Sequence, residues 1–291
     1  MEKKRSQHLT SIVQADLVSI LALVFFVVVV YGLDTLLNPQ FTGFPLVLTG
    51  VVLSLVPAVI WLGFFYRRDR LEPEPKGMVL QVFTLGGLLA AAIGIPVLDN
   101  LFAVDGWLTR STLSHILGAI LVVGFTQEFL KYAAVRFSVF SSGEFDEPVD
   151  GIVYATAAGL GYAALLNVNF VIESGGVDLA VGVIRITVTS LAHASFAGVV
   201  GYFLGQEKFT NRPAWWTASG VALAATLNGV FFFLRSTLTQ GALSTSGSGV
   251  QRWLGFALAA VLATAVTWVL SGTIRKQMQL PGTTAGGMEE A

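Results

Sequence analysis

The chain has 291 residues, of which 54% are hydrophobic and only 12% are charged, with a formal net charge of −1. Soluble domains carry about 25% charged residues, so this composition excludes a soluble globular protein and indicates an integral membrane protein. Nucleic acid is not expected as a partner, because that would require a concentrated basic face. The chain contains no cysteine, which excludes disulfides, thiolate metal ligands and a cysteine nucleophile.

Eight apolar stretches are long enough to cross a bilayer as helices, which takes roughly 20 residues each. In chain order they are expected at 13–35, 44–66, 78–102, 112–137, 149–173, 180–204, 214–236 and 251–273. The first stretch follows a basic start, MEKKRSQHLT, but it is longer than a signal-peptide core and lacks a cleavage site, so we expect it to be retained. These stretches predict an all-α, polytopic membrane protein with about eight transmembrane helices in one bundle over 13–273.

The distribution of Lys and Arg predicts the orientation of this bundle, because these residues accumulate in cytoplasmic loops. With the N-terminus inside and eight spans, the inside segments hold twelve of the 17 Lys and Arg residues, and the outside holds only Arg110, Arg235 and Arg252. Both termini are therefore predicted to be cytoplasmic, residues 1–12 as a short segment and 274–291 as a disordered tail. The expected environment is the lipid bilayer of the cell membrane.

The fourth stretch places charged residues inside an apolar run, in GFTQEFLKYAAVR (124–136). A charge near the middle of a membrane helix costs about 2.5–3.5 kcal/mol on insertion scales. Glu128 and Lys131 are three residues apart, so they share a helix face and can form a pair. That pair could simply join two helices, or Glu128 could be a catalytic carboxylate whose protonation is set by burial and by Lys131. The helix alone does not separate these two readings.

Three later stretches add polar groups at membrane depth. The fifth has small residues at every fourth position, a pattern typical of close helix packing, and Asn167 continues it: Gly151, Ala155, Gly159, Ala163. His193 lies in the middle of the sixth stretch, within LAHASFAGVVGYF, and Asn228 precedes a glycine in the seventh. Because polar side chains are costly in a bilayer, we expect these three to face protein and to have a function.

Four segments together resemble the PrsW family of intramembrane proteases, which is distantly related to the CAAX-prenyl endopeptidases. They are DRLEPEPKG (69–77), GFTQEFLKY (124–132), EFDEPVDGIVYATAAGLGYAALLN (144–167) and LAHASFAGVVGYFLG (191–205). The resemblance covers a core of about 60–236. It implies a bacterial inner-membrane protease that cuts a membrane-anchored protein, since the name-giving member cuts a membrane-bound anti-sigma factor.

The family pattern implies an E-E-x-x-K helix, a further Glu on the next helix and His residues on later helices, which together activate water or hold a metal. Glu128 and Lys131 match the second Glu and the Lys, and His193 matches the first His. The chain departs from the pattern at three positions: Gln127 replaces the first Glu, Leu166 occupies a position that often carries Glu, and Asn228 replaces the last His.

These departures limit the chemistry. Gln127 is a neutral amide and cannot act as a general base, so Glu128 must take that role. A catalytic zinc needs about three protein ligands, and only Glu128 and His193 are candidates, so the ligand set for a divalent metal is incomplete. A metal-free route would use Glu128 as base, His193 as donor to the leaving amine, and the amides of Asn167 and Asn228 to stabilise the oxyanion.

Two functions from different classes follow from the sequence. The first is a PrsW-like intramembrane endopeptidase, favoured by Glu128, Lys131 and His193. The second is a family member that has lost hydrolysis and serves as a membrane-embedded binding or scaffold protein, favoured by Gln127, Leu166 and Asn228. A transporter would predict paired broken helices or an internal repeat, and the sequence shows neither.

Overall fold

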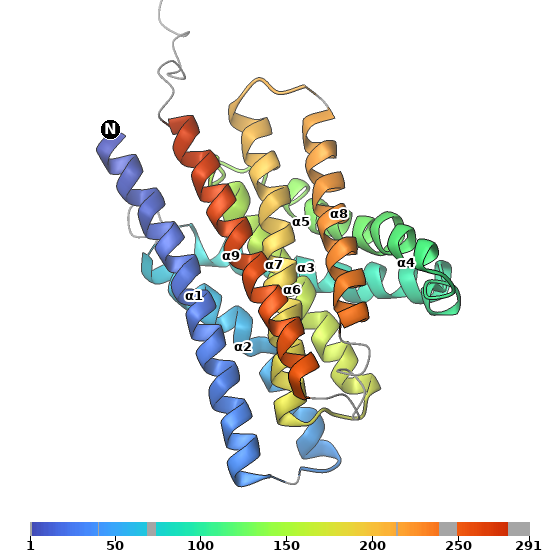
Figure 1. Cartoon of the computed structure of the whole chain (residues 1–291). Coiled ribbons are helices and arrows are strands. Elements are labelled where there is room, and N and C mark those ends of the chain that lie inside the picture. Colours follow the sequence, from blue (N-terminus) through green and yellow to red (C-terminus); the bar gives the residue numbers. More distant parts are fainter. Residues whose placement is uncertain (1, 40, 69–73, 214, 239–248, 279–291) are drawn as a thin grey trace, which may run out of the picture.

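The computed structural model describes residues 2–39, 41–68, 74–213, 215–238 and 249–278, and every regular element in these ranges is a helix (Figure 1). The long helices are α1 (Glu2–Leu37), α2 (Phe44–Arg68), α3 (Lys76–Leu89), α5 (Phe125–Arg136), α6 (Asp150–Glu173), α7 (Leu179–Phe209), α8 (Trp215–Leu238) and α9 (Gly249–Met278). Shorter elements are α4 (Thr112–Gly118), the π-helical turns η1 (Ala90–Gly94), η2 (Val97–Leu101) and η4 (Ala119–Gly124), and the 3₁₀ turn η3 (Val104–Gly106). The predicted all-α fold class is confirmed.

Eight helical segments of the described residues are long and apolar enough to cross a membrane, and each end lies within five residues of its predicted position. They are Leu17–Leu37, Phe44–Leu62, Lys76–Gly106, Thr112–Arg136, Asp150–Glu173, Leu179–Phe209, Trp215–Thr237 and Trp253–Leu270. The third and fourth are composites, because α3 continues through η1 to η3 and α4 continues through η4 into α5. α1 already begins at Glu2 and α9 ends at Met278, so 274–278 are helical, whereas 279–291 of the predicted tail lie outside the described residues.

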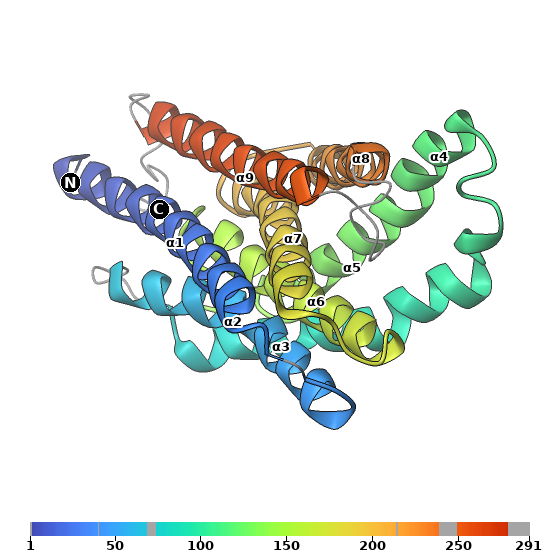
Figure 2. The same ribbon diagram turned by 60° about the horizontal axis from the view of Figure 1, so that its bottom comes forward.

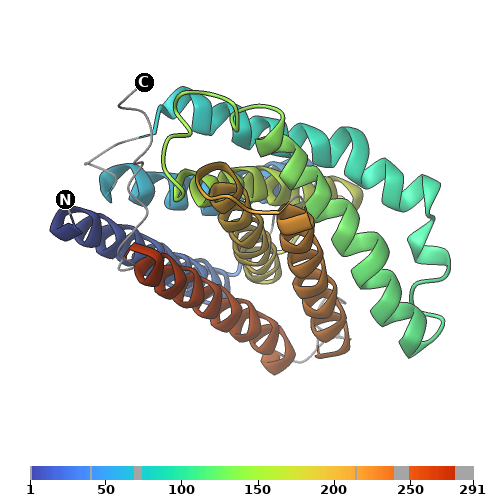
Figure 3. The same ribbon diagram turned by 90° about the horizontal axis from the view of Figure 1, so that it is seen from above.

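α6 and α7 form the centre of the bundle. In the apolar stretch of α6, 67% of the residues are buried, and in that of α7, 83% are buried. The corresponding share is 22% in the first and last spans. α1 and α9 pack beside α7 on one side, and the helices from α3 to α5 lie on the other (Figures 2 and 3). Outward-facing apolar side chains on the outer helices, such as Phe25 and Trp268, suit contact with lipid.

Close backbone contact joins α6 to α3 and to α7. A Cβ atom added at Gly151 would lie 2.3 Å from the carbonyl oxygen of Gly201 on α7. On the other face, one added at Gly86 of α3 would lie 2.2 Å from the carbonyl oxygen of Ala158. Small residues therefore let α6 touch α3 and α7 directly, as the four-residue spacing in its sequence predicts for the α7 side.

Polar contacts tie the end of α5 and the α5–α6 connection to the end of α7 at one end of the bundle. Arg136 Nη1 lies 3.2 Å from Glu207 Oε1, joining the end of α5 to the end of α7. Lys208 Nζ donates to the carbonyl oxygens of Phe140 and Ser142, at 2.7 and 3.2 Å. These bonds hold the α5–α6 connection against α7 and so fix the position of α5 relative to the central pair.

Candidate active site

Two charged side chains of α5, Glu128 and Lys131, are completely buried inside the bundle. Their spacing of three residues puts them on one helix face, and Lys131 Nζ lies 2.5 Å from Glu128 Oε1. The two groups form a charge-assisted hydrogen bond, which is stronger than one between neutral groups. The pairing offsets the cost of burying each charge alone, which would be several kcal/mol.

α8 approaches this pair through direct contact with η4, the π-helical turn that leads into α5. A Cβ atom added at Gly124 would lie 2.3 Å from the carbonyl oxygen of Ala225, and one added at Gly229 would lie 2.5 Å from Ile120 Cα. Glycine at both positions lets the two backbones touch. Asn228, which precedes Gly229, is thereby brought against α5.

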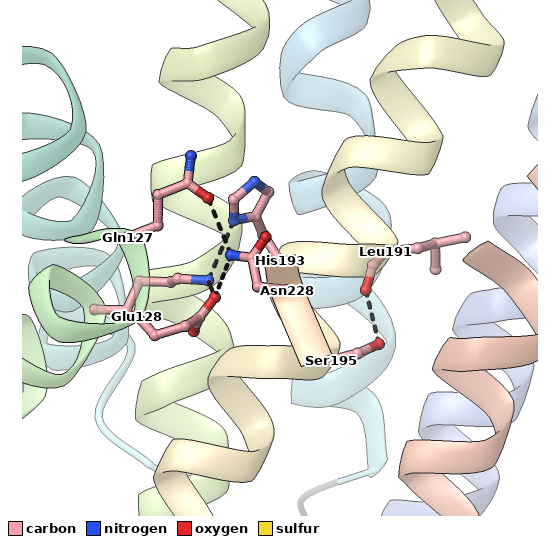
Figure 4. A network of polar contacts seen from close by, with 7 residues as sticks. Gln127, Glu128, Leu191, His193, Ser195 and Asn228 are labelled. Atoms are coloured by element: carbon pink, nitrogen blue, oxygen red, sulfur yellow. Dashed lines mark hydrogen bonds and ion pairs between the residues drawn. The ribbon is translucent and has the colours of Figure 1, made fainter. Parts of the chain in front are cut away.

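The side-chain amide of Asn228 donates to two residues of α5 (Figure 4). Its nitrogen lies 3.0 Å from Gln127 Oε1 and 2.7 Å from Glu128 Oε1. Both hydrogens of the amide group are used in this way. Gln127, Glu128, Lys131, His193 and Asn228 are called the polar cluster below.

His193 reaches the polar cluster from α7, with Nδ1 at 3.1 Å from Lys131 Nζ. Because a lysine ammonium has only donors, Nδ1 must accept this hydrogen bond, and the ring proton is then assigned to Nε2. The imidazole stacks on the ring of Tyr162, with centroids 5.6 Å apart. Gly159 of α6 lets the backbone of α7 come close at His193, since an added Cβ atom would lie 2.6 Å from the His193 carbonyl oxygen.

The two carboxylate oxygens of Glu128 have different surroundings. Oε1 accepts from both Lys131 and Asn228, whereas Oε2 is buried and has no hydrogen-bond partner among the described residues. Gln127 and His193 keep 8% and 7% of their surface exposed, while Glu128 and Lys131 have none. The polar cluster is therefore least deeply buried at Gln127 and His193.

The remaining positions singled out on α6 lie away from the polar cluster. Asn167 Nδ2 donates to the carbonyl oxygen of Ile186, at 3.3 Å. Ile186 precedes His193 by seven residues, which is about 10 Å along α7. Leu166 packs in an apolar group with Leu130 and Tyr162. In the described part of the chain, the contacts that join the polar cluster do not include Asn167.

The donor set of the polar cluster does not suit a divalent metal ion. A catalytic zinc takes about three protein ligands, and among the described residues no three His, Cys, Asp or Glu side chains are grouped to hold one. Lys131 Nζ contacts both Glu128 and His193, so it occupies the place between the two candidate ligands. His193 Nδ1 accepts from Lys131 and Nε2 carries the proton, which leaves Glu128 Oε2 as the free ligand atom of this pair.

Nearby serines do not form a nucleophile–base pair. Ser195 donates to the carbonyl oxygen of Leu191, at 2.7 Å, and points away from His193 (Figure 4). Ser236 lies 3.1 Å from His115 Nε2, but its hydroxyl donates to its own helix backbone at 2.8 Å. Its oxygen therefore accepts from His115, which is the reverse of the arrangement that activates a nucleophile.

Tyr162 is a neighbour of the polar cluster that the sequence pattern does not single out. Its ring centroid lies 5.8 Å from Lys131 Nζ, and its hydroxyl is buried with no hydrogen-bond partner among the described residues. That hydroxyl is close to Gly94 in η1, where an added Cβ atom would lie 2.1 Å from it. The sequence feature that could have pointed to Tyr162 is its hydroxyl group within the small-residue stretch GLGYAALLN, because a polar group is costly at membrane depth.

Known proteins resemble this chain over most of its length. A family model described as "PrsW family intramembrane metalloprotease" matches residues 74–270, which include the whole polar cluster. Protease PrsW of Geobacillus kaustophilus is 33% identical over 182 residues, covering 62% of this chain and 77% of that protein. Protease PrsW of Bacillus subtilis is 31% identical over 192 residues, covering 64% and 83%. No solved structure matches the chain.

Proposed function

The chain belongs to the PrsW family of intramembrane metalloproteases, and on this premise we propose that it hydrolyses a peptide bond of a membrane-anchored protein, with Glu128 as the general base. The observation that supports the proposal is the difference in hydrogen bonding between the two carboxylate oxygens of Glu128. Glu128 Oε1 is held by Lys131 and Asn228, while Oε2 has no hydrogen-bond partner in the part of the chain that the structure describes. A fixed carboxylate with one free oxygen suits proton abstraction from water.

In the first step, a water molecule hydrogen-bonds to Glu128 Oε2 and attacks the carbonyl carbon of the scissile peptide. One water proton passes to Oε2 as the new C–O bond forms. Lys131 and Asn228 keep the carboxyl group in one orientation throughout, so that the base does not have to reorganise.

The negative charge that develops on the substrate oxygen needs a donor. His193 supplies it through Nε2–H, because its Nδ1 is already engaged by Lys131. In the second step the C–N bond breaks, and the proton held by Glu128 passes to the departing nitrogen. This returns Glu128 to the carboxylate form and yields a carboxylic acid and an amine.

The substrate class follows from the location of the polar cluster inside a membrane bundle. A segment anchored in the same bilayer can approach laterally towards Gln127 and His193, the members of the polar cluster with the largest exposed fractions. An anti-sigma factor is a substrate of this type, which the family resemblance implies. Cleavage is proposed near the cytoplasmic half of the bilayer, in line with the predicted orientation.

A second function is supported by the complete burial of Glu128 and Lys131. Such a pair also suits a scaffold in which the charges join α5 to α7 and α8. In that case the polar cluster would stabilise the bundle and bind a membrane partner without hydrolysis.

Cleavage of a pool of single-span membrane peptides by the purified protein in liposomes distinguishes these functions. Glu128→Gln keeps an acceptor for Lys131 and Asn228 but cannot take a proton, so cleavage should fall by at least about 100-fold. Glu144→Gln, an exposed acid in the α5–α6 connection, is the matched control and should cleave as the wild type does. Wild-type cleavage that survives in Glu128→Gln would rule out the assigned base, and no cleavage by a folded wild type would favour the scaffold.

A further inference from the structure

We propose that Lys131 is the resident cation of this site and that the chain works without a metal ion, although its family is described as metalloproteases. The catalytic consequence of this inference rests on the proposed function. Its central claim, that the polar cluster holds an ammonium group where a metal would bind, is independent of activity.

The surroundings of Lys131 suit a cation. Nζ lies 2.5 Å from Glu128 Oε1 and 3.1 Å from His193 Nδ1. The ring centroids of Tyr162 and Phe196 lie 5.8 and 5.9 Å from the same nitrogen. A carboxylate, a ring nitrogen and two aromatic rings therefore surround one positive charge, and the side chain that carries it has no exposed surface.

Charge balance explains why this cation suffices. Glu128 carries one negative charge and Lys131 one positive charge, so the buried pair is neutral. A carboxylate at position 127 would add a buried negative charge without a partner, which a divalent ion could offset. Gln127 removes that charge, and its oxygen accepts from Asn228 at 3.0 Å instead. A divalent ion added to the present cluster would leave an excess of positive charge in a poorly solvated site.

The direction of the hydrogen bonds leads to the same conclusion. A metal requires lone pairs, but Lys131, Asn228 and His193 Nε2 present hydrogens. For zinc to bind between Glu128 and His193, Lys131 would have to leave its buried position, because its ammonium group occupies the lone pair of His193 Nδ1 that faces this place. Gln127 and Asn228 thus belong to one arrangement with Lys131, in which hydrogen bonds hold Glu128 in place of a metal ion.

Zinc binding to the purified wild type is the direct test. After equilibrium dialysis against zinc, we expect less than about 0.1 zinc per chain at the polar cluster, where a catalytic site would hold one. The melting temperature should not change with zinc or with chelator. One tightly bound zinc per chain, lost in His193→Ala and accompanied by a fall in melting temperature on chelation, would overturn the proposal.

A designed variant tests whether Lys131 stands where a metal would bind. The triple variant Gln127→Glu, Lys131→Met, Asn228→His supplies carboxylates and imidazoles in place of the amides and removes the ammonium. We expect it to bind about one zinc per chain and to melt at a higher temperature when zinc is added. Lys131→Met alone is the matched control and should bind none. A folded triple variant that binds no zinc would contradict the proposal, and the wild-type measurement decides the matter if the variant does not fold.

Cleavage assays separate this proposal from the proposed function. Lys131→Ala should lose at least about 100-fold in cleavage, because Glu128 loses a donor that orients it, and added methylammonium should restore part of the rate. A merely structural lysine would show no such rescue, and its absence in a folded variant would count against the proposal. Wild-type cleavage that requires zinc would refute the metal-free reading and leave the protease intact. A metal-free protein that cleaves nothing would refute the protease and leave the cation assignment intact.

Discussion

Asn228 connects two side chains of α5 through one amide group, and its replacement should lower both stability and cleavage. In Asn228→Leu, Gln127 Oε1 loses its donor and Glu128 Oε1 keeps only Lys131. Leaving a buried acceptor unsatisfied costs about 1–3 kcal/mol, and the freed carboxylate should lower cleavage by roughly 10-fold or more. Denaturant unfolding and peptide cleavage measure the two effects.

Asn167→Leu is the matched control, since this amide is also buried but donates to the backbone at Ile186. It should destabilise the bundle by a similar amount while cleavage per folded molecule stays near the wild-type value. If Asn167→Leu abolished cleavage in folded protein and Asn228→Leu did not, the assignment of the site residues would have to be exchanged.

At the scale of single residues, helix spacing predicted what lies within one helix. The three-residue interval placed Glu128 and Lys131 together, as found. Grouping His193 and Asn228 with them rested on the family resemblance, because spacing on one helix carries no information about another. The four-residue pattern put Asn167 on the correct face of α6, but a face does not specify depth. The hydrogen bond from Asn167 to Ile186 lies about 10 Å along α7 from His193.

At the scale of helices, Gly159 sets how closely α6 approaches α7 beneath His193. In Gly159→Ala the new Cβ atom would lie 2.6 Å from the His193 carbonyl oxygen and 2.7 Å from Ala197 Cβ, so the helices must separate. We expect a loss of about 1–3 kcal/mol in stability and a marked loss of cleavage, because His193 moves relative to Lys131.

Gly198→Ala on α7 is the control for that substitution, since its added Cβ atom would meet its nearest neighbours at 3.5 Å, an ordinary contact. Thermal unfolding and cleavage should remain close to the wild type. Equal losses in the two variants would show that glycine content, and not the contact at His193, limits the packing.

Membrane physics explains which features of the helices could be predicted. Backbone groups in a bilayer must be hydrogen-bonded within their own segment, so a run of apolar residues of the right length indicates a helix, and all eight spans were found. The π-helical turns η1, η2 and η4 were not predicted, because hydropathy is the same for α and π geometry. The bonds of two acidic residues were not predicted either. Glu74, just before α3, accepts from the hydroxyl of Tyr154, and this bond depends on how distant segments pack. Asp150, the first residue of α6, accepts from the backbone of Asp146 and Glu147, which depends on how the chain folds back before the helix.

At the scale of the whole molecule, orientation in the membrane remains a prediction from the Lys and Arg distribution. Because the chain contains no cysteine, single cysteines can be introduced without removing others. Ser141 and Thr109 are both exposed and lie in connections at opposite ends of the α4–α5 span. An impermeant maleimide applied to intact cells should label Thr109→Cys but should label Ser141→Cys only after permeabilisation. The opposite pattern would place the termini outside.

The π-helical turn at Ala119–Gly124 determines the direction in which the side chains of α5 face. Its wider winding accommodates about one residue more than an α-helix does over the same rotation. If this turn rewound as regular α-helix with every residue retained, α5 would rotate by roughly 100° about its axis. Glu128 and Lys131 would then swing away from α7 and α8 together. The polar cluster thus depends on one extra residue in η4, a segment that contributes no side chain to the cluster. This turn determines whether the Glu128 carboxylate faces its partners on α7 and α8.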